Sequence, residues 1–126
     1  MKDLTESHSS YHEERVKKWQ TEFKKGFSKP IILLVLSEQS SYPYRLTRLI
    51  REKTNDEINI TGSNIYPILS KLEMEGIISS DQDKETGRKY YRLTSNGNEF
   101  LSVLKTSLKG ILVNTLELIN KKQESV

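Results

Sequence analysis

The sequence contains no cysteine, only three prolines and one tryptophan, and no long apolar run. The absence of cysteine excludes disulfides, thiol catalysis and thiolate metal sites. The longest apolar run, residues 31–36, is far shorter than the roughly 18–20 residues that cross a bilayer. Acidic and basic side chains occur throughout residues 1–27, so we expect no secretory signal, no membrane contact and a cytoplasmic location.

Size and charge narrow the class of protein further. The chain has 126 residues, 34% of them hydrophobic, which suits one small domain with an appended element and excludes a large multi-domain enzyme. Twenty Lys and Arg residues against 17 Asp and Glu residues give a formal net charge of +3. This small excess of positive charge permits a polyanionic partner but does not identify one. The positions of the basic residues therefore matter more than their number.

The N-terminal part combines a polar segment with an amphipathic one. Residues 1–10 are polar and rich in serine, and we expect a loose terminus there. A helix is predicted from Tyr11 to about Phe27, because its large apolar residues recur at steps of three and four: Val16, Trp19, Phe23 and Phe27. This spacing fits packing on the chain's own core and covering a partner chain equally well.

Two short helices are predicted next. Gly26 and Pro30 mark the end of one helix and the start of another. Residues 31–38 are apolar nearly all round, which is typical of the buried central helix of a small domain. Pro43 suits the first turn of a further helix that runs to about Lys53, with one apolar edge formed by Leu46, Leu49 and Ile50.

The helix that precedes Gly76 is the most informative, because four apolar residues share one of its faces: Ile65, Ile68, Leu69 and Leu72. Pro67 conflicts with a helix that begins as early as Thr61, since proline lacks an N–H and crowds the preceding turn. Either Ser63 or Asn64 is therefore the N-cap, or the first turn is irregular. We expect an irregular first turn.

From residue 77 the apolar period changes from 3.6 to 2. Short strands are predicted at 77–80 and 88–93, with a polar loop at 81–87 between them. Thr94 is then placed to cap a long final helix. Its apolar stripe must be buried somewhere, and we predict a homodimer interface formed by this stripe and the N-terminal helix: Trp19, Phe23, Phe27, Leu101, Leu104, Leu108, Ile111, Leu112 and Leu118.

These elements predict a mainly α fold with a small β hairpin (α+β). Three helices followed by a two-stranded hairpin form a winged helix-turn-helix, here flanked by an N-terminal helix and a long C-terminal helix. We divide the chain into a polar tail and amphipathic helix at 1–27, a winged helix-turn-helix at 28–94 and a dimerisation helix at 95–126.

Support for a metal site or an enzyme is weak. His8 and His12 could offer two ligands from one helix, but no third ligand can be named, and two solvated histidines are the simpler interpretation. The acidic residues at 81–85 imitate the start of a calcium loop, yet Thr86 replaces its glycine and Arg92 its final glutamate. We expect no enzymatic activity, no cofactor and no metal.

A nucleic-acid interface has better support. Short polar groups and one cation occupy the outward face of the helix before Gly76: Ser63, Asn64, Tyr66, Pro67, Ser70 and Lys71. Such a face can enter a DNA major groove. Cations also gather in the hairpin and in the preceding helix: Arg88, Lys89, Arg92, Arg45, Arg48 and Arg51. We predict that double-stranded DNA binds here; the alternative is that these bases are solvated surface, and the acids at 81–85 count against binding.

At this point the motifs resemble those of the PadR transcriptional regulators. The run from Gly62 to Ile78 is similar to the family's recognition-helix signature, through its Tyr-Pro pair, its Leu-x-x-Leu-Glu spacing and its closing glycine. The run from Gly87 to Gly97 is similar to the wing and the start of the last helix. Residues 31–46 resemble the opening helix and turn, so the resemblance covers roughly residues 28–120.

The resemblance implies a homodimeric DNA-binding protein, usually a repressor, whose last helix forms the dimer. It implies DNA contacts from the recognition helix and the wing: Ser63, Asn64, Tyr66, Lys71, Arg88 and Lys89. The chain departs from the family at Tyr42-Pro43, where His-Gly is usual, at Arg45, where an acid is usual, and at residues 61–64, where Ser-Pro-Gly-Thr is frequent. Base preference is therefore not implied.

Two other functions are open alternatives. Some family members bind phenolic acids or flat aromatic drugs between their subunits through a tryptophan on the last helix. Here the single tryptophan is Trp19, on the first predicted helix, so a small aromatic effector is an alternative and not an expectation. The other alternative is a winged helix that serves for protein–protein contact.

Overall fold

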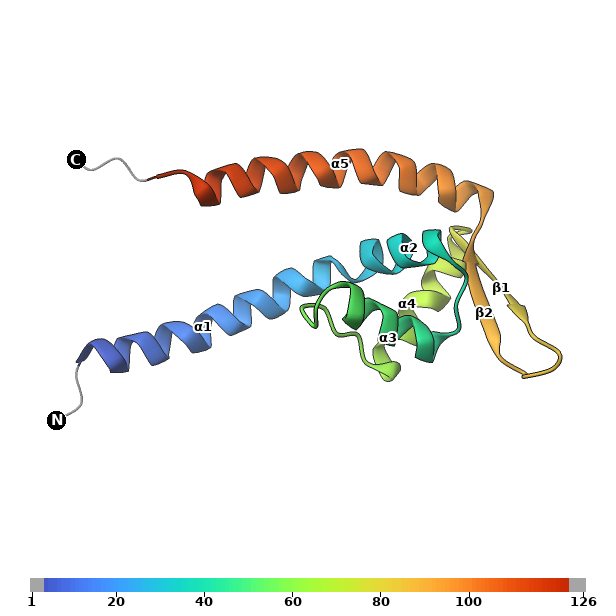
Figure 1. Cartoon of the computed structure of the whole chain (residues 1–126), viewed down its shortest axis with the longest axis horizontal. Coiled ribbons are helices and arrows are strands. Elements are labelled where there is room, and N and C mark those ends of the chain that lie inside the picture. The colour runs from blue at the N-terminus through green and yellow to red at the C-terminus, as the bar shows by residue number, and fades with distance from the viewer. Residues whose placement is uncertain (1–3, 123–126) are drawn as a thin grey trace.

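The computed structural model describes residues 4–122, and the side chains of residues 10–122. The described residues form five helices and one two-stranded antiparallel sheet (Figure 1). In chain order these are α1 Leu4–Gly26, α2 Ser28–Glu38, α3 Pro43–Lys53, α4 Gly62–Met74, β1 Ile78–Gln82, β2 Lys89–Leu93 and α5 Ser95–Asn120. The predicted winged helix-turn-helix, with an added helix at each end, is confirmed.

Helix α2 lies at the centre of the core, as its apolar sequence predicts. Its Ile32 and Leu33 are 0% and 1% exposed, and α2 packs against α3, β2 and α5. The remaining core residues come from every other element of the winged helix and from the first turns of α5: Leu46, Ile50, Ile60, Ile65, Leu69, Leu72, Ile77, Ile78, Tyr91 and Leu101. The body from α2 to the start of α5 therefore contains a complete small core of its own.

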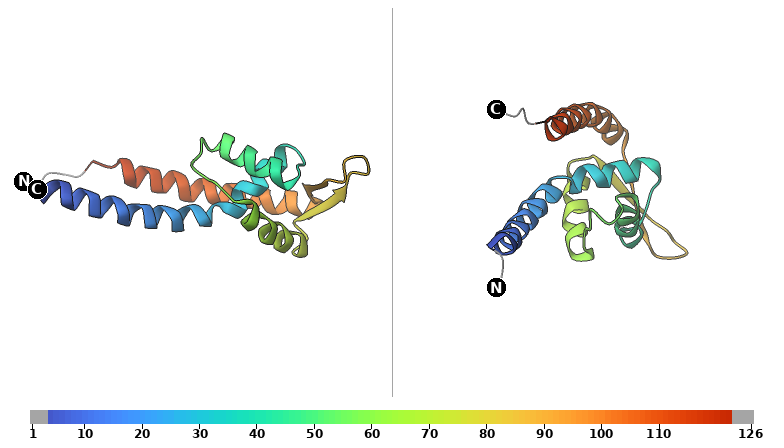
Figure 2. Two further views of the ribbon diagram at one scale, coloured as in Figure 1. Left: turned by 90° about the horizontal axis from the view of Figure 1, so that it is seen from below. Right: turned by 60° about the vertical axis from the view of Figure 1, so that its left-hand side comes forward.

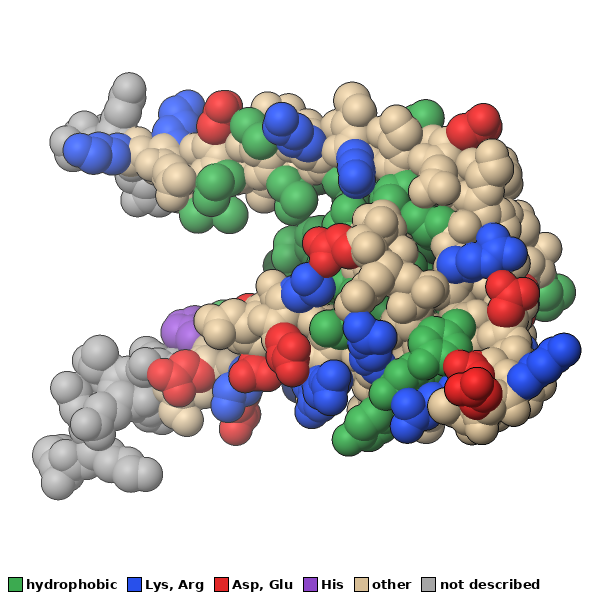
Figure 3. Space-filling view, turned by 45° about the vertical axis from the view of Figure 1, so that its right-hand side comes forward, with side chains coloured by type: hydrophobic (Ala, Val, Ile, Leu, Met, Phe, Trp, Pro, Cys, Tyr) green, Lys and Arg blue, Asp and Glu red, His purple; other side chains and the backbone are tan. Residues whose placement is uncertain are grey.

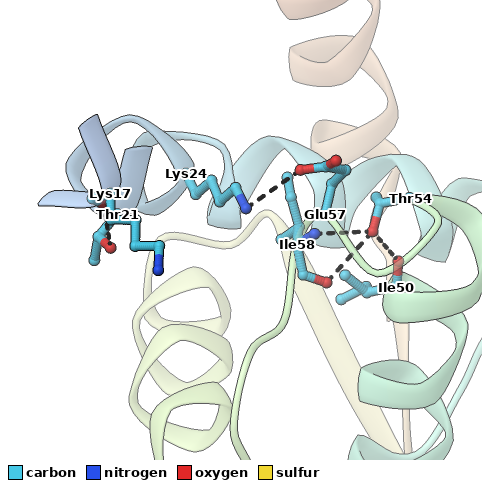
Figure 4. A network of polar contacts seen from close by, with 7 residues as sticks. All are labelled: Lys17, Thr21, Lys24, Ile50, Thr54, Glu57 and Ile58. Atoms are coloured by element: carbon cyan, nitrogen blue, oxygen red, sulfur yellow. Dashed lines mark hydrogen bonds and ion pairs between the residues drawn. The ribbon is translucent and has the colours of Figure 1, made fainter. Parts of the chain in front are cut away.

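The loop from α3 to α4 is held by the Thr54 hydroxyl (Figure 4). This hydroxyl donates to the carbonyl of Ile50 at 2.7 Å and accepts from the N–H of Ile58 at 3.1 Å, so it closes the end of α3 and starts the loop. Lys24 Nζ lies 3.3 Å from Glu57 Oε2, which links the end of α1 to the same loop. These contacts fix the spacing between α3 and α4.

Helix α4 does not begin as expected. The expected irregular first turn is wrong, because the N–H of Ile65 donates to the Thr61 carbonyl at 3.0 Å in a regular turn. The alternative caps Ser63 and Asn64 are wrong too, since Thr61 is the N-cap. Pro67 lies inside the helix, where its missing N–H leaves the Ser63 carbonyl without its helical donor. Ser63 is exposed, so solvent can supply a donor in its place.

The hairpin pairs β1 with β2 in antiparallel register, with Ser80 opposite Tyr91. The first strand lies slightly later than the predicted 77–80, and the loop shortens to 83–88. On the other edge of β2, Ser41 exchanges two backbone hydrogen bonds with Tyr91, at 3.1 and 2.8 Å. The turn that precedes α3 is thereby joined to the wing.

The start of α5 is tightly fitted to the body. The Thr94 hydroxyl accepts from the N–H of Gly97 at 2.9 Å, which confirms the predicted N-cap, and it donates to the carbonyl of Gly76 at 2.6 Å. A Cβ at Gly97 would overlap the carbonyl oxygen of Ile77. Glycine at this position therefore allows α5 to cross the end of α4 at close range.

Helices α1 and α5 extend from the body as two arms that point in the same general direction (Figures 1 and 2). The prediction of a loose terminus at 1–10 is wrong for residues 4–10, which are helical. An established helix extends over polar residues at little cost, because only its first turn is expensive to form. Residues 1–3 lie outside the described part of the chain.

The C-terminal arm is shorter than the predicted range of 95–126. Helix α5 ends at Asn120, and residues 123–126 lie outside the described residues.

Within residues 4–122, none of the helices has the length and apolar character needed to span a bilayer.

Candidate nucleic-acid interface

Helix α4 presents its predicted DNA-facing residues to solvent. Ile65 and Leu69, on its inner face, are both 0% exposed, which fixes the rotation of the helix about its axis. As a result all six residues predicted on the outer face are exposed: Ser63, Asn64, Tyr66, Pro67, Ser70 and Lys71. Lys71 has no acidic partner within ion-pair distance among the described side chains, so its charge is available to a ligand.

Helix α3, the end of the following loop and the N-terminal end of α4 frame a hollow. Tyr66, 58% exposed, and Tyr44, 72% exposed, both line it, together with Thr47 and Arg51. Tyr44 was missed by the sequence analysis, although its place next to Pro43 in the first turn of α3 is a signal that could have found it. Two exposed aromatic rings and a cation at the head of the recognition helix suit contact with nucleotides.

The three wing cations that were predicted to bind DNA, Arg88, Lys89 and Arg92, differ in what they contact. Arg92 Nε lies 3.0 Å from Asp81 Oδ2, and Lys89 Nζ lies 4.0 Å from Glu73 Oε1. Arg88, in contrast, has no carboxylate within ion-pair distance among the described side chains. The expected conflict between the loop acids and the wing cations is therefore real for Arg92, whose charge is partly neutralised by Asp81.

Glu73 connects the recognition helix to the wing. Its Oε2 accepts a hydrogen bond from Ser80 Oγ at 2.6 Å, while its other oxygen faces Lys89. The carboxylate therefore holds both strands of the hairpin to the last turn of α4. Since Lys89 is exposed and its ion pair is long, the pair adds little stability, and phosphate can replace the carboxylate as its partner.

The loop acids have a structural use. Asp83 Oδ1 accepts hydrogen bonds from the N–H groups of Glu85 and Thr86 at 2.8 and 3.4 Å, which shapes the turn of the wing. Gly87 completes that turn with φ of +73°. Among the side chains of residues 10–122, no three acidic or histidine groups are arranged to hold a metal ion. The side chain of His8 lies outside the described residues.

The apolar residues predicted to form a dimer interface divide into two groups. Leu101 is 3% exposed and belongs to the chain's own core, which Leu104 also contacts, so Leu101 presents little surface to a partner. The first turns of α5 must cross α2 to continue from Thr94, and this buries them. Phe27 and Leu108 are partly buried, while the remaining residues are exposed: Trp19 and Leu118 at 72%, Phe23 at 63%, Ile111 at 59% and Leu112 at 42%.

The apolar residues of α1 do not pack on the chain's own core. Trp19 and Phe23 lie on α1 and remain open to solvent, so their stripe is not covered by this chain's own core. In Figure 3, hydrophobic side chains gather on the side of the α5 arm that faces the notch between the two arms. Both arms therefore present apolar surface outside the body.

The winged-helix geometry is matched by a family of known proteins. The PadR-like family of transcriptional regulators matches residues 32–103, more than half of the chain. The chain belongs to this family. PadR-like proteins are DNA-binding transcriptional regulators and not enzymes, which agrees with the polar outer face of α4.

Individual relatives agree with the assignment. The structure of a transcriptional regulator from Clostridium thermocellum is 31% identical with a TM-score of 0.67, covering 77% of this chain and 93% of that one. The structure of a PadR-like transcriptional regulator from Bacillus cereus is 25% identical with a TM-score of 0.69, and the match covers 78% of this chain and 96% of that one. An uncharacterized protein from Lysinibacillus sphaericus is 32% identical over 83 residues, which cover 64% of this chain and 76% of the relative.

Proposed function

We propose that this PadR-like regulator is a homodimeric repressor that acts in the cytoplasm on a two-fold symmetric DNA operator. Helix α4 enters the major groove, and the wing contacts the flanking phosphates. The observation that carries this proposal is the division of α4 into a largely buried apolar face and an exposed polar face. Only the polar face can meet DNA, because the opposite face lies in the core.

The outer face contains groups with distinct roles toward DNA. The Asn64 amide, at the N-terminal end of α4, has a donor and an acceptor that suit the edge of a base. Lys71 and Arg88 carry charges suited to phosphates, which position the protein without reading sequence. We therefore assign specificity chiefly to Asn64 and salt-dependent affinity to the two cations.

The two exposed arms support a homodimer. A second copy of the chain would cover the apolar residues of α1 and α5, and a two-fold axis would relate the two recognition helices. Such a dimer reads half-sites about one helical turn, or ~34 Å, apart. Repression follows if the occupied operator overlaps the site at which RNA polymerase binds.

DNA binding is tested on duplex fragments that the protein selects from genomic DNA. Lys71→Ala is expected to weaken binding to selected and random duplexes alike and to lower the slope of log affinity against log salt by about 0.9, because one phosphate contact is lost. Asn64→Ala is expected to reduce discrimination between the two duplexes by about 1–3 kcal/mol. Lys18→Ala, on the exposed surface of α1, is the control and should change neither quantity.

Three outcomes contradict this proposal. Equal losses on selected and random DNA in Asn64→Ala would remove Asn64 from the base-reading residues. An unchanged salt slope in Lys71→Ala would remove its phosphate contact. A protein that binds no duplex at low salt would overturn the proposed function as a whole.

The dimer is tested by light scattering. We expect a mass about twice the 14.6 kDa of one chain, and one close to 14.6 kDa for Leu112→Glu, because a charge buried without a partner strongly disfavours association. Thr106→Glu adds the same charge on the opposite side of α5 and should remain dimeric. Trp19 fluorescence should shift to longer wavelength when the wild type is diluted, as its ring becomes exposed. A monomeric wild type contradicts the dimer.

A planar aromatic effector is the second candidate function, favoured by the surroundings of Trp19. An apolar hollow along α1 is lined by Val16, Trp19 and Phe23, with His12, Arg15 and Gln20 at its edges. Flat aromatic compounds that bind there should quench Trp19 fluorescence and weaken operator binding. Quenching without any change in operator affinity would argue against an effector role.

A further inference from the structure

The side chain of Arg88 is stacked on an aromatic ring from a distant part of the chain. Its guanidinium carbon lies 4.3 Å from the centroid of the Tyr42 ring, well inside the range of a cation–π contact. The Tyr42 ring is itself held edge-on by Tyr90, with centroids 5.5 Å apart and an interplanar angle of 77°. Tyr42 is the N-cap residue of α3, whereas Arg88 and Tyr90 belong to the wing.

The backbone on both sides of this stack is fixed. Ser41, next to Tyr42, exchanges two backbone hydrogen bonds with Tyr91 of β2, which hold the main chain at Tyr42 beside the wing. The carbonyl of Arg88 accepts from the N–H of Asp83 at 2.8 Å, which closes the base of the wing turn. With both main chains held, the aromatic contact determines where the long Arg88 side chain lies.

The contact with Tyr42 leaves the N–H donors of the Arg88 guanidinium free to bind an anion. A guanidinium stacks through its flat face, while its N–H donors lie around its edge and point away from the ring. Two other wing cations each face a carboxylate, Asp81 for Arg92 and Glu73 for Lys89. Of the three wing cations predicted to bind DNA, Arg88 is the one that, among the described side chains, can meet an anion without first leaving an acidic partner.

We propose that Tyr42 is a positioning residue that holds the Arg88 guanidinium ready to donate to a DNA phosphate at the edge of the operator. The contact acts by restricting rotamers before binding, so that less side-chain freedom is lost when DNA arrives. This inference rests on the proposed function, because DNA supplies the phosphate. It adds a residue of α3 to the set that determines how the wing binds.

The stack itself is tested without DNA. The ring current of Tyr42 should shift the NMR signals of the Arg88 side-chain CH₂ protons in the free wild-type protein. We expect Tyr42→Phe to keep this shift, because the ring remains, and Tyr42→Leu to abolish it. Unshifted Arg88 signals in the wild type would overturn the proposal, and this result needs no variant that might fold poorly.

The effect on DNA binding is then measured with the selected duplex. Tyr42→Leu should weaken binding by about two- to fivefold, the factor that corresponds to an exposed cation–π contact of roughly 0.5–1 kcal/mol. It should leave the salt slope unchanged, since Arg88 still reaches its phosphate. Arg88→Ala should lower the slope by about 0.9. In the Arg88→Ala background, Tyr42→Leu should have no further effect, and Tyr42→Phe alone should bind as the wild type does.

Tyr11→Leu is a matched control. Tyr11 also lies under an arginine, with Arg15 at 5.5 Å from its ring, but on α1, away from the wing. This variant should bind DNA as the wild type does. An affinity loss for Tyr42→Leu that persists in the Arg88→Ala background would assign Tyr42 a merely structural role and overturn the proposal. Wild-type protein that binds no duplex would instead overturn the proposed function, and this inference with it.

Discussion

The body and the two arms of this protein use apolar residues in opposite ways. In the body, Leu46 and Leu69 are 0% exposed, while on the arms Trp19 and Leu118 are each 72% exposed. Both regions show helical spacing of apolar residues, so periodicity alone does not distinguish them. The difference teaches that the body can fold on its own contacts, whereas the arms expose surface suited to a second chain.

Helix α5 contains both buried and exposed apolar residues. Leu101, near its start, is 3% exposed against the core, and the apolar residues of its second half are exposed. The change occurs where the helix passes beyond the end of the body (Figure 1). A single helix can thus serve as a wall of one core and as the contact surface of an assembly.

The largest effect is expected from a pair of identical leucine truncations. Leu46→Ala should lower the free energy of unfolding by about 2–5 kcal/mol, because it leaves a cavity in a closed core. Leu116→Ala, at a residue 56% exposed in this chain, should cost little in dilute solution and more as the protein concentration rises. Urea unfolding at several concentrations measures both. A large, concentration-independent loss for Leu116→Ala would contradict the distinction between body and arm.

A smaller effect is expected from two glycines of α5. Gly97→Ala should destabilise the protein by about 1–3 kcal/mol, because the added Cβ meets the backbone of Ile77. At Gly110 an added Cβ meets no atom of the described residues within 4 Å, so Gly110→Ala should stabilise the helix by up to about 1 kcal/mol. Thermal unfolding compares the two variants. If Gly110→Ala destabilises the protein, a second chain approaches α5 closely at that point.

The smallest effect is expected from removing a buried hydroxyl group in the body. The Ser41 hydroxyl is buried and has no hydrogen-bond partner in the described part of the chain, so Ser41→Ala should raise the free energy of unfolding by up to about 1 kcal/mol while keeping the backbone bridge to Tyr91. Ser40→Ala, at the exposed neighbouring position, should stay within about 0.5 kcal/mol of the wild type. A loss of stability in Ser41→Ala, measured by urea unfolding, would show that the hydroxyl has a partner in solution.

Much of the body could be predicted because its signals are local. The apolar run of α2, Pro43 at the start of α3 and Thr94 at the start of α5 each act within one turn of chain, and the structure confirms all three. The outward face of α4 followed from helical periodicity. The N-cap of α4 did not, because Pro67 was expected to disrupt a helix that begins at Thr61, whereas the structure accommodates it at the loss of one helical hydrogen bond.

The rest depends on which segments meet in space. Leu101 and Leu118 occupy similar positions in the apolar stripe of α5, and only the place where the body ends separates a core residue from an exposed one. Likewise, Arg88, Lys89 and Arg92 are all exposed cations in the sequence pattern, yet their different partners arise from the hairpin register and from α4. Such contacts join segments that lie far apart in the sequence, so no short sequence pattern predicts them.

The bridge between Ser41 and Tyr91 has a consequence for behaviour at high concentration. A hairpin that projects into solvent has two strand edges, and an open edge invites pairing with the strand of another molecule. Here Ser41 occupies part of the β2 edge, while β1 is short and carries the charge of Asp81. The wing can therefore reach outward without serving as a template for cross-molecular sheets.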